Sequence, residues 1–382
     1  MSRSRDNADA VTTVPSGVGR NMVINGGMNV SQRGTSLTMA HDGVQSGYLL
    51  DRFGISMGGN QETFDGAYSQ ASDGPNGVSA NSILWTTGTA ESAVAADEIF
   101  YIYQVIEAQN CQRLSLGTSA SKQVTLSFYV NSSITGTYGV SIYKPDAAGG
   151  LTVSIVTGTY TISSADTWER KTITFPSGTA SSLGITDDNG QGLFINWHLQ
   201  AGSDYTATDG TSWGDYATGK WAFGHAQNGV VTTAGATWGI TGVQMEVGPI
   251  ATEFEQEDIS TTLAKCQRYC QRFPAQDQAD AGDFTFLGMG YNASTTEQEA
   301  SFPLPVTMRI EPTGTFSGNF RVLHAATATA VSSGPVISDA ASSNSCLLIS
   351  STVGSTALTV GQASGLGQND DVDAHAIFDA EL

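Results

Sequence analysis

Apolar and polar residues alternate along most of the chain with a period of two. In residues 122–133, one side of the segment is apolar and is formed by Val124, Leu126, Phe128 and Val130. This period is typical of a strand that buries one face. Similar segments recur at short intervals up to about residue 255, at 81–90, 99–108, 137–144, 151–162, 168–175 and 192–199. Their spacing predicts two sheets packed face to face, as a sandwich or jelly roll.

The period changes between residues 255 and 273, where the apolar residues are four, three, four and three positions apart. They are Ile259, Leu263, Cys266, Cys270 and Phe273. This spacing predicts a helix with a narrow apolar seam, which Asp258 or Ser260 could cap at its start. Two heptads are too few to specify a coiled coil. The seam therefore packs either against the chain's own sandwich or against other subunits at an oligomer axis.

Strand signals resume near residue 283 and predict a second, smaller β domain. The segments are 283–291, 300–308, 314–323, 345–352, 356–362 and 374–382. The predicted fold is thus all-β, with a jelly-roll sandwich, a short helix and a second β domain. The predicted parts are an N-terminal arm or attachment linker at 1–20, the jelly roll at 21–255, the connecting helix at 256–274 and the C-terminal β domain at 275–382.

Composition agrees with this fold and narrows the function. Of the 382 residues 44 are glycine, and only 14% are charged, against about 25% in typical soluble domains. The formal net charge of −20 repels phosphate backbones, so nucleic acid is not an expected partner. Such an acidic surface either keeps a large assembly soluble or binds cations. No run approaches the roughly 20 apolar residues of a membrane span, so membrane insertion is not expected.

Motifs for catalysis or cofactor binding do not appear in the sequence. We find no Gly-x-Ser-x-Gly elbow, His-Glu-x-x-His pair or Walker loop, and the histidines are scattered. The four cysteines are irregularly spaced and are expected to be small buried hydrophobes; Cys266 and Cys270 lack a third metal ligand nearby. We therefore predict no catalytic residues, no metal and no cofactor, although a pair of carboxylates that cleaves glycosides cannot be recognised by spacing alone.

The best candidate for ligand contact is the Gly- and Thr-rich segment at residues 204–225. Its aromatic residues include Tyr205, Trp213, Tyr216 and Trp221. Sugars present flat C–H faces that stack on aromatic rings, so these four residues are predicted to bind carbohydrate. The alternative is that the rings fold back over the edge of the sandwich.

The chain also resembles a known family of proteins. The segments that carry the resemblance are NMVINGGMNVSQRGTS (21–36), GYLLDRFGI (47–55), TLSFYVNSSITGTYGVSIY (125–143), TWERKTITF (167–175) and ITGVQMEVGPIATEFEQED (240–258), which leads into LAKCQRYCQRF (263–273). Together with PVTMRIEPTGTFSG (305–318), they resemble bacteriophage tail-fibre and virion surface proteins. In that family a jelly roll similar to carbohydrate-binding modules is followed by a helix and a β-rich tip domain.

This resemblance implies a virion structural protein of a tailed phage, most simply a tail fibre or receptor-binding protein that contacts host surface polysaccharide. It implies a homotrimer, attachment to other virion proteins through the arm, and assembly in the host cytoplasm. The alternatives are a purely structural decoration or connector protein and a polysaccharide depolymerase.

The sequence leaves open whether the motif residues Asp51 and Arg52 are buried or solvated. Asp51 and Arg52 are adjacent in a predicted strand and so face opposite sides. If Arg52 faces inward it needs a carboxylate, because a buried unpaired guanidinium is costly, and Glu246 is a candidate. The alternative is that both residues are solvated at a sheet edge.

Overall fold

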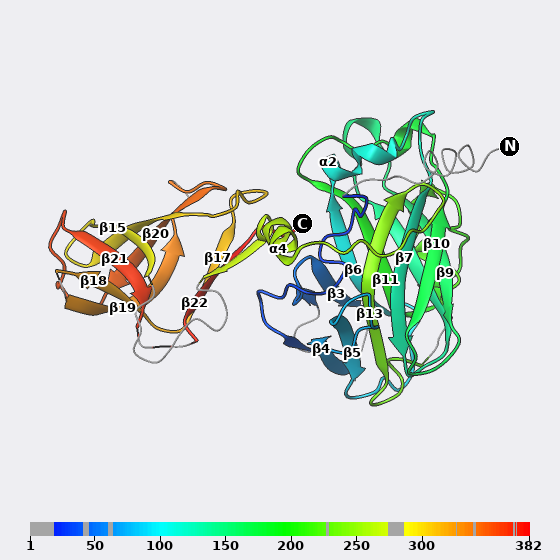
Figure 1. Cartoon of the computed structure of the whole chain (residues 1–382), viewed down its shortest axis with the longest axis horizontal. Helices are drawn as coiled ribbons and strands as arrows, with labels where there is room; N and C mark the ends of the chain where they lie inside the picture. The colour runs from blue at the N-terminus through cyan, green and yellow to red at the C-terminus, as the bar shows by residue number, and fades with distance from the viewer. Residues whose placement is uncertain are drawn as a thin grey trace, which may run out of the picture. The chain divides into compact units, whose positions relative to one another are not determined.

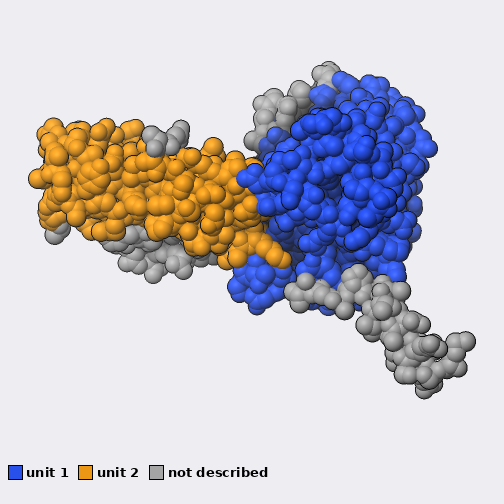
Figure 2. Space-filling view, turned by 90° about the horizontal axis from the view of Figure 1, so that it is seen from above, with its two compact units in different colours: residues 1–262, 382 blue, residues 263–381 orange. Residues whose placement is uncertain are grey.

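The structure is a computed structural model of the chain. It describes residues 19–40, 46–59, 64–226, 229–273, 286–325, 327–338, 341–369, 371 and 373–382. The chain divides into two compact units, one of residues 1–262 with Leu382 and one of residues 263–381 (Figures 1 and 2). The predicted all-β fold is confirmed: a sandwich is followed by a short helix and a smaller β unit. No helix in the described part of the chain has the length and apolar character needed to cross a membrane.

The first unit is a jelly-roll sandwich of two antiparallel sheets (Figure 1). The first sheet has the order β1 (Ser36–Ala40), β4 (Asp65–Ala71), β5 (Ser82–Thr87), β13 (Thr237–Val247), β7 (Val124–Ser132) and β10 (Glu169–Phe175). The second sheet has the order β12 (Gly214–Asp215), β9 (Ser154–Ile162), β8 (Gly136–Lys144), β11 (Gln191–Ala201), β6 (Ile99–Glu107), β3 (Phe53–Gly58) and β2 (Ser46–Tyr48). Short helices α2 (Ala108–Cys111) and α3 (Ser203–Thr206) lie in the connections. All seven strands predicted between residues 81 and 199 are present.

The core of this unit lies between the inward faces of the two sheets. The four apolar residues predicted to share a side of β7 are all buried. Trp85, Trp197 and Trp238 are completely buried there. The ring centroid of Trp85 is 4.6 Å from that of Phe100, which joins β5 of the first sheet to β6 of the second. Burial of a large aromatic side chain contributes about 2–3 kcal/mol, so these rings are major stabilisers of the sandwich.

The first motif segment forms an irregular connection held by Asn25. Asn25 adopts φ 61°, and its Nδ2 donates to the carbonyl oxygens of Val30 (2.9 Å) and Asp51 (3.0 Å). Its Oδ1 accepts from the backbone N–H groups of Asn29 (2.9 Å) and Val30 (3.0 Å). An asparagine tolerates this left-handed conformation and supplies both donors and acceptors, which explains its place in the motif.

Asp51 and Arg52 are both buried, so the interpretation as solvated edge residues is wrong. The Asp51 carboxylate accepts from the backbone N–H and from Nε2 of Gln32, each at 2.7 Å. Nη2 of Arg52 donates to the carbonyl oxygen of Val105 in β6. The polar turn at residues 31–34 thus docks on the strand that follows it through Asp51.

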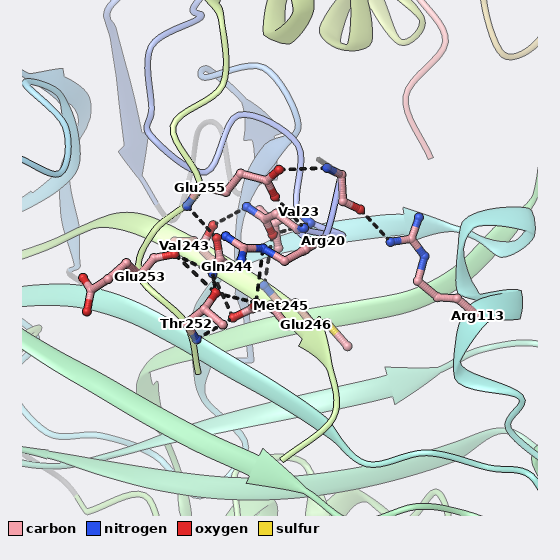
Figure 3. A network of polar contacts seen from close by, with 12 residues as sticks. Arg20, Val23, Arg113, Val243, Gln244, Met245, Glu246, Thr252, Glu253 and Glu255 are labelled. Carbon is pink, nitrogen blue, oxygen red and sulfur yellow. Dashed lines mark hydrogen bonds and ion pairs between the residues drawn. The ribbon is translucent and has the colours of Figure 1, made fainter. Parts of the chain in front are cut away.

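Glu246 takes part in a different network, which ties the start of the described chain to β13 (Figure 3). Its Oε1 lies 3.8 Å from Nε of Arg20 and accepts from Oγ1 of Thr252 at 2.6 Å. Glu255 accepts from the N–H groups of Gly19 (2.8 Å) and Asn21 (3.1 Å). Residues 19–21 are therefore held against β13 and the segment that follows it.

Helix α4 (Ile259–Gln267) is shorter than predicted, because the chain enters strand β14 (Cys270–Phe273) directly afterwards. Asp258 caps its start: Oδ1 accepts from the N–H of Ser260 at 2.9 Å. Cys270 and Phe273 pair with Asp379 and Ala376 of another strand, so they do not continue a helical seam from Ile259. Backbone pairing in this sheet overrides the helical spacing of the side chains.

The second unit contains a three-stranded sheet and a closed six-stranded barrel. The sheet has the order β14, β22 (His375–Asp379) and β17 (Thr313–Ser317). The barrel has the order β15 (Phe286–Asn292), β16 (Glu297–Pro303), β20 (Cys346–Val353), β19 (Thr327–Ile337), β18 (Phe320–His324) and β21 (Ala363–Gln368). The strand predicted at 356–362 is wrong, and β21 begins just after it in the sequence ASGLGQ. Glycines have low strand propensity, so this sequence gives a weak strand signal.

Candidate functional site

Aromatic side chains gather on the outer face of the second sheet. Tyr101 and Tyr103 of β6, Tyr143 of β8 and Phe194 of β11 are all partly exposed. Each of these residues stands next to a core residue such as Ile102, Ile142 or Ile195, because successive side chains of a strand point to opposite faces. Register brings the rings together, since Phe194 is the cross-strand partner of Tyr143. Their centroids are 5.8 Å apart.

The segment that follows β11 lies over these rings and contributes two more. Trp221 is placed by a 3₁₀ turn at Thr218–Lys220, and its N–H donates to the carbonyl oxygen of Thr218 at 3.0 Å. Its ring centroid lies 4.9 Å from Tyr143, 5.6 Å from Tyr216 and 5.9 Å from Tyr101. We call this group the aromatic platform; it consists of Tyr101, Tyr103, Tyr143, Phe194, Tyr216 and Trp221.

Backbone hydrogen bonds fix the segment that carries Trp221. The N–H of Ala222 donates to the carbonyl oxygen of Tyr205 at 2.9 Å, and that of Ala226 donates to Thr137 in β8 at 3.0 Å. The N–H of Thr208 donates to Gly219 at 2.9 Å. The platform is therefore ordered before any ligand arrives, which reduces the entropy lost on binding.

A row of buried polar groups lies beside the rings on the same face. Nε2 of His198 is 3.0 Å from Oγ of Ser141, which also accepts from Nδ2 of Asn196 at 3.2 Å. Burial holds the pKa of His198 well below its usual range, with a smaller effect of His225. Burial also lowers the pKa of His225 to about 4, and its Nδ1 accepts from the N–H of Gly139 at 3.1 Å. Both imidazoles are neutral at physiological pH.

The phenols of Tyr101, Tyr143 and Tyr205 are neutral as well. Burial raises the pKa of Tyr101, Tyr143 and Tyr205, and the nearby phenol of Tyr216 raises all three further. A neutral phenol is both a donor and an acceptor of hydrogen bonds. The platform thus combines apolar ring surfaces with uncharged polar groups, which is the chemistry that a sugar's C–H faces and hydroxyls require.

The structure places the four predicted carbohydrate-binding residues in two locations. Tyr216, which is 38% exposed, and Trp221 belong to the platform, and Tyr205 lies beside Tyr216 and Tyr101. Trp213 lies elsewhere: its ring packs on the sandwich core, and Nε1 donates to the carbonyl oxygen of Pro176 at 2.9 Å. Trp213 therefore follows the alternative in which a ring folds back over the sandwich.

The four rings contributed by β6, β8 and β11 are not among the residues predicted from the sequence. The signal was present at residues 99–108 and 137–144, where tyrosines occupy the face opposite the buried aliphatic residues. All of the described cysteines are free, and Cys111, Cys266 and Cys270 are buried, as expected of small hydrophobes. Among the residues that the structure describes, no group of three or more His, Cys, Asp or Glu side chains could hold a metal ion.

Comparison with known proteins gives no relative at the level of sequence: no family model and no curated protein matches the chain. Several solved structures match at low similarity. The enzymatically active domain of tailspike protein 4 from bacteriophage CBA120 has a TM-score of 0.31 and 11% identity, over 60% of this chain and 21% of that one. The chain thus spans about a fifth of the tailspike structure.

Two further matches are sugar-binding proteins by their names. A family 11 carbohydrate-binding module from Clostridium thermocellum, in complex with a mixed-linked tetrasaccharide, has a TM-score of 0.28 and 11% identity, over 57% of this chain and 98% of that one. A putative sugar binding protein from Bacteroides thetaiotaomicron has a TM-score of 0.30 and 10% identity, over 59% of this chain and 99% of that one. Similarity at this level identifies neither a ligand nor an activity.

Proposed function

We propose that this chain is a glycan-binding protein of the surface of a tailed-phage virion, a tail fibre or receptor-binding protein that contacts host polysaccharide. The observation that carries the glycan-binding part is the aromatic platform. Its rings come from three adjacent strands and one overlying segment, and Trp221 contacts three of the others. Several rings on one sheet face suit a chain of sugar residues better than a single small ligand.

The proposed interaction is stacking supported by hydrogen bonds. A pyranose ring places its C–H face on an aromatic ring, and neutral phenols exchange hydrogen bonds with its hydroxyls. A single site of this kind is weak, and several sites on linked chains gain avidity through effective concentration. A receptor-binding protein that must hold a cell surface would benefit from this multivalency.

The virion assignment rests on the sequence resemblance, and the partners follow from it. Residues 1–18 of the predicted arm lie outside the described residues, and attachment to other virion proteins through the arm is part of the proposal. A homotrimer is also part of the proposal. Two apolar residues of α4 could contact other subunits in it: Ile259, which is 55% exposed, and Leu263, which is partly exposed. Light scattering on a gel-filtration peak tests the trimer, and a monomeric mass would remove it.

We further propose that the chain binds glycan without cleaving it. The platform consists of partly exposed aromatic rings, and its tyrosine phenols can bind and orient hydroxyl groups. Glycoside cleavage instead needs two carboxyl groups placed on either side of the scissile bond.

One experiment tests binding and cleavage together. The purified full chain is incubated with crude surface polysaccharides from a panel of bacteria, and bound protein and new reducing ends are measured in the same wells. Saturable binding without new reducing ends is the expected result. Release of reducing ends would indicate a depolymerase instead, and the absence of both signals on every extract, including that of the true host, would indicate a purely structural virion component.

A further inference from the structure

The charged residues that accompany the aromatic platform are mostly acidic. Residues 203–226, which form the segment that lies over the platform strands, contain three aspartates and one lysine. The aspartates are Asp204, Asp209 and Asp215, and all three are exposed. Asp97, in the turn before β6, is exposed as well. The loops around the platform thus carry four carboxylates that face solvent.

Two of these carboxylates act on a phenol beside the platform. Burial raises the pKa of Tyr205 most, and further increases come from the Tyr216 phenol and from the negative charges of Asp97 and Asp204. The backbone holds the two aspartates in place, since the N–H of Asp204 donates to the carbonyl oxygen of the residue before Asp97 at 3.0 Å. A third carboxylate, that of Asp215, directly precedes Tyr216, the most exposed ring of the platform.

Positive charge is scarce in the same elements. Strands β6, β8 and β11 and residues 203–226 contain two lysines, Lys144 and Lys220, and no arginine. Lys144 is buried, Lys220 is partly exposed, and Nζ of each donates to a main-chain carbonyl oxygen. His198 and His225 are neutral and add no charge. Binding of a carboxylate or phosphate group is strongest where a cationic side chain can pair with it, and these elements offer only Lys220 against the four carboxylates.

From this charge distribution we infer that the platform selects polysaccharides whose sugars carry no acidic groups. The inference rests on the proposed glycan-binding function and names the ligand class of that site. The charges of Asp97 and Asp204 that act on Tyr205 also repel an anionic group bound beside this phenol. Neutral hexoses and N-acetylated amino sugars avoid this repulsion and can still stack on the rings and bond to the phenols.

Fractionation of the polysaccharides tests the ligand class. Each crude surface polysaccharide of the bacterial panel is separated on an anion exchanger into a neutral and an acidic fraction. Binding of the full chain to both fractions is then measured at about 0.15 M NaCl, where surface charges more than about 8 Å apart are largely screened. We expect saturable binding to a neutral fraction and at least about tenfold weaker binding to every acidic fraction.

The outcomes separate this inference from the proposed function. Equal or tighter binding to an acidic fraction would overturn the selection and leave glycan binding intact. Binding to no fraction of any extract, including that of the true host, would contradict glycan binding and the selection with it.

A charge-matched pair of variants assigns the selection to the platform, because the net charge of −20 also repels acidic polymers. We expect Asp204→Asn/Asp215→Asn to bind acidic fractions about threefold more tightly than the wild type, with unchanged Tm and unchanged affinity for neutral fractions. The control Glu297→Gln/Glu311→Gln removes the same charge from exposed positions of the second unit and should change neither affinity. An equal gain in both double variants, or no gain in Asp204→Asn/Asp215→Asn, would overturn the role of the platform carboxylates.

Discussion

The indole ring of Trp221 packs edge-on against the phenol ring of Tyr143, with centroids 4.9 Å apart and ring planes at 64°. This contact joins the segment after β11 to the outer face of the second sheet. Aromatic pairs in this geometry contribute about 0.5–1.5 kcal/mol beyond the burial of their area. The contact therefore keeps the platform in one arrangement, and the remaining ring surfaces are available to a ligand.

Tyr216 is the platform ring that is most accessible to a ligand. We expect Tyr216→Ala to weaken polysaccharide binding about 2- to 12-fold, the equivalent of about 0.5–1.5 kcal/mol for one stacking contact. The matched control is Tyr291→Ala, since Tyr291 is also exposed but lies on β15 of the second unit. Binding isotherms on one polysaccharide measure both variants, and equal affinities of the two would argue against the platform as the binding surface.

The stability of the first unit is expected to depend on pH through His225. Burial lowers the pKa of His225 from 6.5 to about 4, so between these values the unfolded chain binds a proton that the folded chain does not. Stability is therefore complete above pH 6.5 and falls as the pH approaches 4, by about 3 kcal/mol for this one group. His198, shifted in the same direction, adds to the loss.

The variant His225→Asn tests this dependence. The asparagine Oδ1 can still accept from the N–H of Gly139, but the side chain no longer binds a proton. Urea unfolding followed by tryptophan fluorescence at several pH values should show a shallower loss of stability below pH 6.5 in the variant. An unchanged slope would mean that His225 is not responsible for it.

Asn25 is expected to stabilise the first unit through both halves of its amide. Asn25→Asp keeps the acceptor for the N–H groups of Asn29 and Val30, but replaces the donor with an oxygen that faces the carbonyls of Val30 and Asp51. We expect a loss of about 2–4 kcal/mol in the free energy of unfolding, because donors are lost and a buried negative charge is introduced. The exposed control Asn29→Asp should change it by less than about 0.5 kcal/mol, and a stable Asn25→Asp variant would show that the motif does not hold the turn.

Two truncations distinguish the role of the N-terminal arm from that of the residues that stabilise the sandwich. Removal of residues 1–18 is expected to leave the Tm of the first unit unchanged and to abolish attachment to the virion while polysaccharide binding is retained. Removal of residues 1–21 should lower the Tm, because it deletes the bonds of Gly19 and Asn21 with Glu255 and the contacts of Asn21 with β13. If the shorter truncation still assembles into particles, the arm is not the attachment point.

The sandwich could be predicted from the sequence because the seven strands between residues 81 and 199 each carry their own signal. In β7, four apolar residues at alternate positions are enough to identify both the strand and its buried face. The barrel was harder, since β21 has the sequence ASGLGQ and β19 is largely polar on its exposed face. The helix was predicted too long because Cys270 and Phe273 continue the helical spacing while their backbone pairs with β22.

The aromatic platform could be predicted only in part. Tyr216 and Trp221 stand out in a Gly-rich segment, but their neighbours Tyr101 and Tyr143 belong to strands that are far away in the sequence. Only the register of β6, β11 and β8 brings those rings under the segment.

Loss of binding on replacement of Trp221 tests the central claim most directly. Trp221→Ala removes the ring at the centre of the platform. A central aromatic residue of a binding surface typically contributes about 2 kcal/mol or more to the free energy of binding. We therefore expect affinity for the host polysaccharide to fall at least about 30-fold. The control is Trp168→Ala, because Trp168 stands next to β10 of the opposite sheet and donates to the carbonyl oxygen of Asp73. The predicted result is that Trp221→Ala remains folded and binds the polysaccharide more weakly, whereas Trp168→Ala binds it as the wild type does. Unchanged affinity in a folded Trp221→Ala variant would contradict the account.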